Sequence, residues 1–310
     1  MRQRLEAYGR RKMFNLYFAG STDKDTNSFM KKHRVARLFS YAGEQKEIEF
    51  YNEGERGNLF VDSGAFSVAH AGKSVDIDSY IAYINSHPEV NVWAELDSIP
   101  FPILNSHTAK KSCEKSWDAY LYIMERITVD PDKLLPIYHF GEPFSGLERI
   151  LNTEVRGKLP DYIGVGGRHG VSTKEQEKYF ETVFRIVKNS KNPKVKIHAF
   201  GMTVLDLLQK YSFHSADSTS WLMVANNGSI IGKRGNWYVS DKAKSAPNHI
   251  LNQPELAKKQ FFKEIEEFGF TYEQVSTDYK SRWKYNILFM KRWADNYVYR
   301  PHFVKTRKLF

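Results

Sequence analysis

Cysteine is almost absent from this chain of 310 residues, because Cys113 is the one residue of its type. With a single thiol, neither an intramolecular disulfide nor a zinc site built from several cysteines can form within the chain, which indicates a reducing compartment. A run of about 18 apolar residues, the length of a membrane span, is also missing. No apolar segment of signal-peptide length follows the basic start MRQRLEAYGRRK. We therefore expect a cytoplasmic protein without membrane contact.

The composition excludes a disordered chain. Hydrophobic residues make up 41% of the sequence, and it holds 21 Phe, 18 Tyr and 6 Trp, which is enough to build a sizeable core. The net charge is +10, from 46 basic and 36 acidic side chains. Such a charge attracts polyanions, nucleic acid first among them, but a merely basic surface would have the same composition.

Eight short runs rich in β-branched and aromatic residues occur in the first 220 residues, each bounded by Gly, Pro, Asp or Ser. A helix-like or polar stretch follows each run, so predicted strands and helices alternate. The predicted strands are Met13 to Phe18, Val35 to Tyr41, Asn58 to Val61, Val90 to Leu96, Leu134 to His139, Tyr162 to Val165, Val195 to Phe200 and Phe213 to Asp217. The predicted helices include Ile77 to Ser86, Ser112 to Ile127, Lys174 to Lys188 and Val204 to Lys210.

This alternation predicts a parallel sheet covered by helices, and eight units are the number that closes a (β/α)8 TIM barrel. A doubly wound open sheet is the structural alternative. We favour the barrel because five of the eight strands end in polar or glycine-rich signatures, whereas an open sheet concentrates its ligand site at one switch point. The predicted fold class is thus α/β, with a barrel over residues 1–225 and an appendage over residues 226–310.

The appendage begins with a glycine-punctuated hairpin, Gly228 to Val239, and reads as helices from Pro254 onward. Its last helix, Ser281 to Asn296, interleaves basic residues with aromatic ones. Aromatic residues at helical spacing usually pack into a core, which predicts a helix packed on the barrel. The alternative is a basic surface that holds nucleic-acid phosphates. The cationic candidates for that surface are Arg168, Lys233, Arg234, Arg282 and Lys284.

Four segments could carry chemistry at strand ends. They are VDSGAFS around Asp62, WAELDSIP around Asp97, YIGVGGR up to Arg168, and HSADSTSW around Asp217. A strand-terminal Asp can simply cap the following helix. Three of them at one barrel mouth are harder to explain in that way. Neighbouring buried carboxylates push their pKa values apart, so one can stay ionised as a nucleophile while another moves protons.

These segments resemble the tRNA-guanine transglycosylase (queuine tRNA-ribosyltransferase) superfamily. The motifs that carry the resemblance appear in the family's order: DSGAF at Asp62, LDSIP at Asp97, GVGG from Gly164, HAFGMTVLDLL from His198, and the strand exit at Asp217. The resemblance covers roughly Met13 to Trp221. It implies a glycosyltransferase that exchanges guanine in a nucleic acid for a 7-deazaguanine base such as preQ0, with no cofactor.

Carried over residue by residue, the resemblance implies that Asp217 attacks C1′ of a guanosine nucleotide and forms a covalent glycosyl-enzyme. Asp62 would be the general acid/base for the proton of the base. The implied base pocket consists of Asp97, Ser63, His139, Gly166 and Gly167. In that pocket Asp97 would bind the Watson–Crick edge, the two glycines would use backbone groups, and His139 stands where the family usually has glutamine.

Two departures from the family bear on the polymer. The cysteine-rich zinc site that follows the barrel in the tRNA enzymes is missing, and Ser218 to Trp221 replace the usual proline-threonine-arginine turn. Both differences lie where tRNA would be gripped. The chain in this respect resembles divergent, phage-associated relatives that modify DNA, so we favour DNA over tRNA as substrate and expect a location in host cytoplasm if the chain is phage-encoded. A homodimer is compatible with the sequence.

Three other functions remain open on the sequence alone. A metal-dependent barrel hydrolase could use His139, His169, His198 and Asp217, although the usual His-x-His at the end of the first strand is missing. A retaining glycosidase would also use paired carboxylates. A non-catalytic nucleic-acid-binding subunit is the third alternative, but it would have no use for both Asp62 and Asp217.

Overall fold

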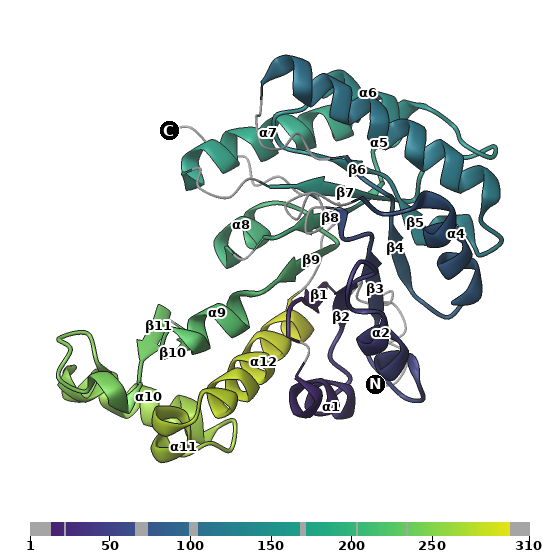
Figure 1. Ribbon diagram of the computed structural model, residues 1–310. Coiled ribbons are helices and arrows are strands. Elements are labelled where there is room, and N and C mark those ends of the chain that lie inside the picture. Colours follow the sequence, from purple (N-terminus) through teal and green to yellow (C-terminus); the bar gives the residue numbers. More distant parts are fainter. Residues whose placement is uncertain are drawn as a thin grey trace, which may run out of the picture.

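The computed structural model describes residues 14–21, 23–65, 74–98, 105–167, 172–202, 204–233 and 235–297. Its centre is a ring of parallel strands, as predicted for a (β/α)8 barrel (Figure 1). The strands are β1 Asn15–Phe18, β2 Arg37–Ser40, β3 Leu59–Asp62, β4 Val92–Ala94, β5 Leu134–Leu135, β6 Ile137–Tyr138, β7 Tyr162–Gly166, β8 Lys196–Phe200 and β9 Ser215–Ser218. They are hydrogen-bonded in the order β5-β4-β3-β2-β1-β9-β8-β7-β6.

Pro136 divides the fifth predicted strand into β5 and β6. A proline has no N–H to donate to a ladder, so the first half pairs with β4 and the second half pairs with β7. The Pro136 carbonyl still accepts a hydrogen bond from the Gly164 N–H at 2.8 Å. The two halves of one strand therefore close the ring, and the eight predicted strands are all present.

Alternation along the strands divides the side chains between two cores. One set points into the barrel and forms a compact cluster of Tyr17, Ala19, Leu38, Phe60, Val92, Ala94, Leu135, Ile137 and Tyr162. The residues between them point outward and pack beneath the helices, for example Phe18, Phe39 and Val61. A period of two is the property of a strand, so this division follows directly from the sequence.

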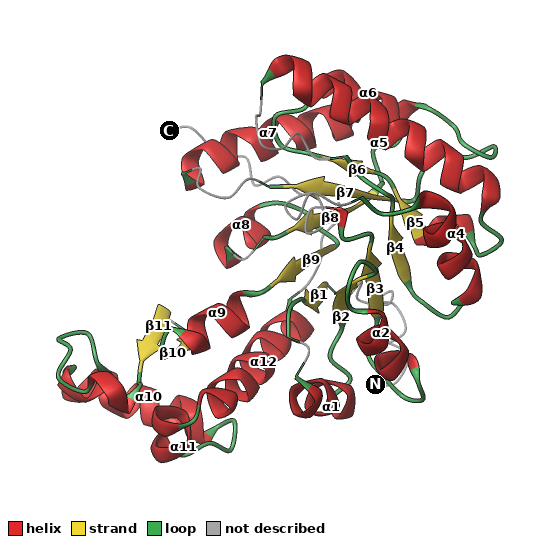
Figure 2. Cartoon of the chain, in the orientation of Figure 1, coloured by secondary structure: helices red, strands yellow, loops and turns green. Residues whose placement is uncertain are grey.

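Helices cover the outside of the ring (Figure 2). They are α1 Lys24–Lys32, α2 Gln45–Asn52, α4 Ile77–Ser86, α5 Ser106–Arg126, α6 Phe144–Asn152, α7 Thr173–Asn189 and α8 Leu205–Lys210, with a short 3-10 turn, η2, at Pro131–Lys133. Helix α5 begins six residues before the predicted start at Ser112. The Asn105 side chain caps the Thr108 N–H and Thr108 bonds back to the Asn105 N–H, and this capping box explains the earlier start.

Helix α9 Ser220–Asn226 follows the last strand of the barrel. The appendage comprises the antiparallel hairpin of β10 Ser229–Gly232 and β11 Gly235–Tyr238, the 3-10 turns η3 Asp241–Ala243 and η4 Ile250–Asn252, α10 Glu255–Glu266, α11 Tyr272–Thr277 and α12 Tyr279–Asn296. Hairpin and helices are as predicted. Helix α12 returns to the barrel and lies beside α1 and β1 (Figure 1).

Helix α12 runs parallel to α1. Lys280 near its start pairs with Asp23 at the N-terminal cap of α1, at 2.8 Å, and Trp293 near its end packs edge-on against Phe14 before β1. Its aromatic residues Trp283, Tyr285 and Phe289 are buried. The prediction that this helix packs its aromatics on the barrel is confirmed for Trp283, which packs on Trp221, and for Trp293. Tyr285 and Phe289 instead pack against Phe268 of the appendage.

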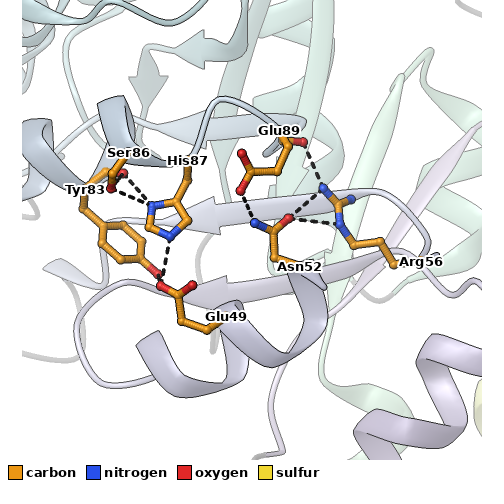
Figure 3. Close-up of polar contacts among 7 residues, drawn as sticks. All are labelled: Glu49, Asn52, Arg56, Tyr83, Ser86, His87 and Glu89. Atoms are coloured by element: carbon orange, nitrogen blue, oxygen red, sulfur yellow. Dashed lines mark hydrogen bonds and ion pairs between the residues drawn. The ribbon is translucent and has the colours of Figure 1, made fainter. Parts of the chain in front are cut away.

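A polar network ties α2 to the end of α4 at the amino-terminal side of the strands (Figure 3). The His87 ring lies between the Glu49 carboxylate at 2.9 Å and the Tyr83 carbonyl at 2.8 Å. The Arg56 guanidinium donates to Asn52 Oδ1 at 3.0 Å and to the Glu89 carbonyl at 2.9 Å. In barrels this end serves stability, and the opposite end carries chemistry.

Across the described ranges, each helix is too short or too polar to span a bilayer.

Candidate active site

Two carboxylates point into the barrel at its carboxyl-terminal mouth. Asp62 follows the inward-facing Phe60 by two positions on β3, and Asp217 follows the inward-facing Ser215 by two positions on β9. A period of two places both side chains on the inner face. In β1, between them, Tyr17 is paired with Asp217. The barrel therefore brings together side chains that are 155 positions apart in the sequence.

The protonation of Asp62 is set by its surroundings. Burial of the carboxyl group, the negative charge of Asp97 and that of Asp217 raise its pKa from 3.8 to about 7, although the Ser63 and Gly64 N–H groups act in the opposite direction. Asp97 and Asp217 therefore lie close enough to Asp62 for their charges to raise its pKa. A carboxyl group with a pKa near 7 can both donate and accept a proton at neutral pH.

Asp217 is held through one of its two oxygens. Its Oδ1 accepts a hydrogen bond from the Gly201 N–H at 2.7 Å and lies 3.3 Å from His198 Nε2. The residue is 8% exposed. Because both contacts fall on Oδ1, among the described residues they leave Oδ2 available to a bound molecule.

Four of the five predicted base-binding residues lie in one connected group. Ser63 Oγ donates to Asp97 Oδ1 at 3.2 Å, and His139 Nε2 lies 2.8 Å from Asp97 Oδ2 in a contact that is close but not linear. A Cβ atom on Gly166 would come within 2.8 Å of His139 Nδ1, so only glycine fits beside that ring. Gly167 follows directly, and a Cβ atom there would lie 3.8 Å from the Phe200 carbonyl oxygen, an ordinary contact distance.

His139 is poised to carry a positive charge. Burial disfavours the charged ring, but contact with the Asp97 carboxylate and the charges of Glu142 and Asp62 outweigh it, so its pKa is raised above the ordinary value. The Glu142 carboxylate also accepts a hydrogen bond from the backbone N–H of His139 at 3.0 Å. A cationic His139 has N–H donors on both ring nitrogens.

Two buried acids beneath the mouth were not predicted. Glu95 is 1% exposed and Glu142 is 5% exposed. Burial, followed by neighbouring acids, raises the pKa of both side chains, and Glu95 departs furthest. Glu95 does lie within the segment WAELDSIP, but nothing in the strand pattern distinguishes it from a solvent-facing residue. Glu142 lies in a loop, where periodicity carries no signal.

Of the predicted phosphate contacts, Lys233, Arg282 and Lys284 lie among the described residues. Arg168 and Arg234 lie outside the described residues. Lys233 pairs with Glu267 at 3.4 Å, and the Lys284 ammonium lies 5.7 Å from the Phe29 ring centre.

Arg282 requires a correction. It is 6% exposed, and its guanidinium donates to the backbone carbonyls of Ala225, Val275 and Ser276 at 2.9 to 3.2 Å. These bonds hold α12 against α9 and α11. Arg282 is therefore placed as a structural residue, and we remove it from the candidate nucleic-acid surface.

The metal-hydrolase alternative finds no ligand set in the part of the chain that the structure describes, where no group of three or more His, Cys, Asp and Glu side chains is arranged to hold a metal ion. His139 and His198 each face a single carboxylate. His169 lies outside the described residues.

Neither a comparison with models of protein families nor one with curated proteins gives a match to this chain.

Proposed function

We propose that the chain is a transglycosylase that exchanges guanine in a nucleic acid for a 7-deazaguanine base. The observation that carries the proposal is the pairing of two carboxyl groups with different properties at one barrel mouth. Asp62 has a pKa of about 7, whereas Asp217 is anchored through Oδ1 by the Gly201 N–H and the His198 ring. Such a pair suits a displacement that needs a nucleophile and a proton shuttle.

In the first half of the proposed reaction, Oδ2 of ionised Asp217 attacks C1′ of the nucleotide. The bond from C1′ to N9 of guanine breaks as the bond from Oδ2 to C1′ forms. Protonated Asp62 gives its proton to the departing base, so guanine leaves as a neutral molecule. The result is a glycosyl ester on Asp217 and an ionised Asp62.

In the second half, a 7-deazaguanine such as preQ0 occupies the position that guanine has left. Ionised Asp62 removes the proton from N9 of the incoming base, and N9 attacks C1′. The ester bond to Asp217 breaks, which regenerates the carboxylate, and Asp62 is again protonated. Atoms and charges balance over the two halves, and no cofactor is needed.

The group of Ser63, Asp97, His139 and Gly166 supports a base-binding role. Asp97 offers carboxylate oxygens to the N–H groups on the Watson–Crick edge of a guanine-like base, and Gly166 and Gly167 let the plane of a base approach the backbone. The Ser63 hydroxyl and the His139 ring contact the Asp97 carboxylate from within the protein and fix its orientation.

DNA is the favoured polymer in the proposal, and tRNA is the alternative. The net charge of +10 supports a polyanionic partner of either kind. The segment Ser218 to Trp221 packs into the protein at its end: Trp221 is fully buried, and its indole N–H donates to the Ala19 carbonyl at 3.0 Å. A base within a duplex would have to be extruded to reach Asp217.

The test is base exchange. The protein is incubated with radiolabelled guanine or a labelled 7-deazaguanine and, separately, with duplex DNA, single-stranded DNA and bulk tRNA, and the label in each polymer is counted. We expect label in DNA with the native chain and none with Asp217→Asn. Label in tRNA alone would change the substrate and keep the mechanism.

If none of the three polymers gains label, the proposal is refuted, and the hydrolase and binding-subunit alternatives remain. Asp130→Asn is a matched control, because Asp130 caps the η2 turn by accepting from the Asp132 N–H, far from the mouth in the fold. This variant should exchange bases at the native rate.

A further inference from the structure

A chain of hydrogen bonds runs through the interior of the barrel to Asp217. The Tyr162 hydroxyl contacts Ser215 Oγ, Ser215 Oγ lies 2.5 Å from His198 Nδ1, and His198 Nε2 lies 3.3 Å from Asp217 Oδ1. Ser215 and His198 stand opposite each other in the register of β8 and β9. The strand pairing itself therefore brings the middle of this chain together.

The surroundings of the chain keep His198 neutral and fixed in place. The ring is fully buried, and the rings of Tyr17, Phe60, Tyr162 and Phe200 surround it with centre-to-centre distances of 4.4 to 6.4 Å. Burial lowers its pKa below the ordinary value, although Asp217 opposes that effect. A neutral imidazole has one N–H donor and one bare nitrogen acceptor.

Counting donors along the chain leaves one consistent arrangement. The ionised Asp217 carboxylate has no proton to give, so His198 must carry its proton on Nε2 and donate to Oδ1. The bare Nδ1 must then accept, so the Ser215 O–H donates to it. Ser215 Oγ can in turn accept the Tyr162 O–H. Every donor points toward Asp217.

We propose that His198 is a positioning residue that acts on Asp217 through an Nε2–H group, and that Ser215 and Tyr162 fix the ring in the orientation needed for this task. The other tautomer would aim a bare nitrogen at the carboxylate and repel it. Together with the Gly201 N–H, the Nε2–H group immobilises Oδ1 and leaves Oδ2 directed to the substrate. Because the ring is neutral, it orients the carboxylate without neutralising the charge that makes it a nucleophile.

The tautomer can be measured without reference to catalysis. The full-length protein is labelled with ¹⁵N in its histidine rings, and the ring resonances of His198 are identified as those that vanish in His198→Gln. At pH 7.5 we expect a protonated Nε2 and a bare Nδ1. In Ser215→Ala, Asp217 still accepts from Nε2, so Nε2 should stay protonated, while the Nδ1 resonance should shift because Nδ1 has lost its hydrogen-bond donor.

A doubly protonated ring or an Nδ1–H tautomer in the native protein would overturn the inference, and so would an unchanged Nδ1 resonance in Ser215→Ala. These spectra decide the matter even if the chain exchanges no base.

The catalytic consequence rests on the proposed function. In the exchange assay, Ser215→Ala and Tyr162→Phe should lower kcat roughly 10- to 100-fold, the range seen when the partner that orients a reacting group is removed. KM for the incoming base should stay within about 2-fold, because the base pocket is untouched. Tyr211→Phe is the matched control, since that hydroxyl is buried elsewhere and donates to the Glu177 carbonyl at 2.8 Å; its kcat should not change.

The two proposals fail in different ways. No exchange by the native protein would refute the proposed function while the spectra still test the tautomer. Exchange by the native protein with full kcat in Ser215→Ala would refute the positioning role and leave the proposed function in place.

Discussion

In the proposed reaction, a single proton on Asp62 links base exchange to the stability of the fold. Its pKa of about 7 lies above the ordinary value of 3.8, mainly because burial and the charges of Asp97 and Asp217 disfavour the ionised form. Between those two pH values the folded state holds a proton that the unfolded state has lost. The free energy of unfolding therefore decreases as pH rises through this window, and the cost is fully present above about pH 7.

We accordingly expect Asp62→Asn to abolish base exchange and to stabilise the fold at pH 8. Because the residue keeps some contact with solvent, the gain in the free energy of unfolding is about 1–2 kcal/mol at pH 8 and close to zero at pH 4. Urea unfolding at the two pH values measures it. If the proposed exchange takes place, the native protein should release guanine more slowly as pH rises above about 7, because Asp62 then lacks the proton that it would donate.

A variant equally stabilised at both pH values would show that the charge of Asp62 is not the cause. Asp76→Asn is a contrasting control, because Asp76 is an exposed cap of α4 that accepts from the Ser79 N–H, and its pKa is lowered by those bonds. Its stability should move in the opposite direction, with a loss at pH 8.

At the scale of the elements, the break between β5 and β6 shows how the barrel accommodates a proline in a strand. Pro136 removes a donor, and the ladder to β4 ends at Ala94 and Leu135. The next N–H, that of Ile137, is satisfied by Glu95 Oε1 at 2.6 Å. A side chain thus replaces the backbone acceptor that the interrupted ladder lacks.

Glu95→Ala should therefore destabilise the fold by about 2–4 kcal/mol, because it leaves the buried Ile137 N–H without an acceptor and opens a cavity. Glu95→Gln keeps an acceptor of the same shape and should cost much less. Since burial raises the pKa of Glu95 well above its usual range, the native protein also loses stability as pH rises from that range, and the glutamine variant, which lacks this carboxyl group, should lose less. Urea unfolding from pH 5 to pH 9 distinguishes the three proteins. Equal losses in both variants would contradict the role of the acceptor.

At the scale of the whole molecule, α12 makes the appendage part of the barrel's outer layer. Phe14, ahead of the first strand, packs against Trp293 and Tyr297, and Trp221 packs against Trp283. The Asn286 amide donates to the Trp221 carbonyl at 2.9 Å in the interior. Large apolar surfaces of the barrel are thus covered by residues at the far end of the chain.

Truncation after Asn226 should for this reason yield an aggregating or unfolded fragment, even though it keeps all eight strands. Removal of α12 would expose Trp221 and Phe14, and burial of each aromatic side chain contributes about 1.5–3 kcal/mol. Size-exclusion chromatography and near-ultraviolet circular dichroism of the fragment test this. A soluble, cooperatively unfolding fragment of residues 1–226 would show that the boundary predicted at residues 225 and 226 separates independent domains.

The sequence by itself determined the eight strands and the carboxylates at their ends. These are local properties: a period of two assigns a residue to one face, and a polar residue after an apolar run marks where a strand ends. That is how Asp62, Asp97 and Asp217 could be predicted to meet, since the carboxyl ends of all strands in a barrel lie at one mouth.

Only the tertiary structure decided the properties that depend on neighbours distant in sequence. The pKa of Asp62 depends on residues that other strands bring near. Arg282 has the sequence environment of a surface cation, yet three carbonyls from other segments hold it in the interior. In the sequence, His198 was a candidate ligand for the metal-hydrolase alternative. The register of β8 with β9 places Ser215 against it. Periodicity reports which face a side chain occupies, but the partner on that face is chosen by strand pairing and packing.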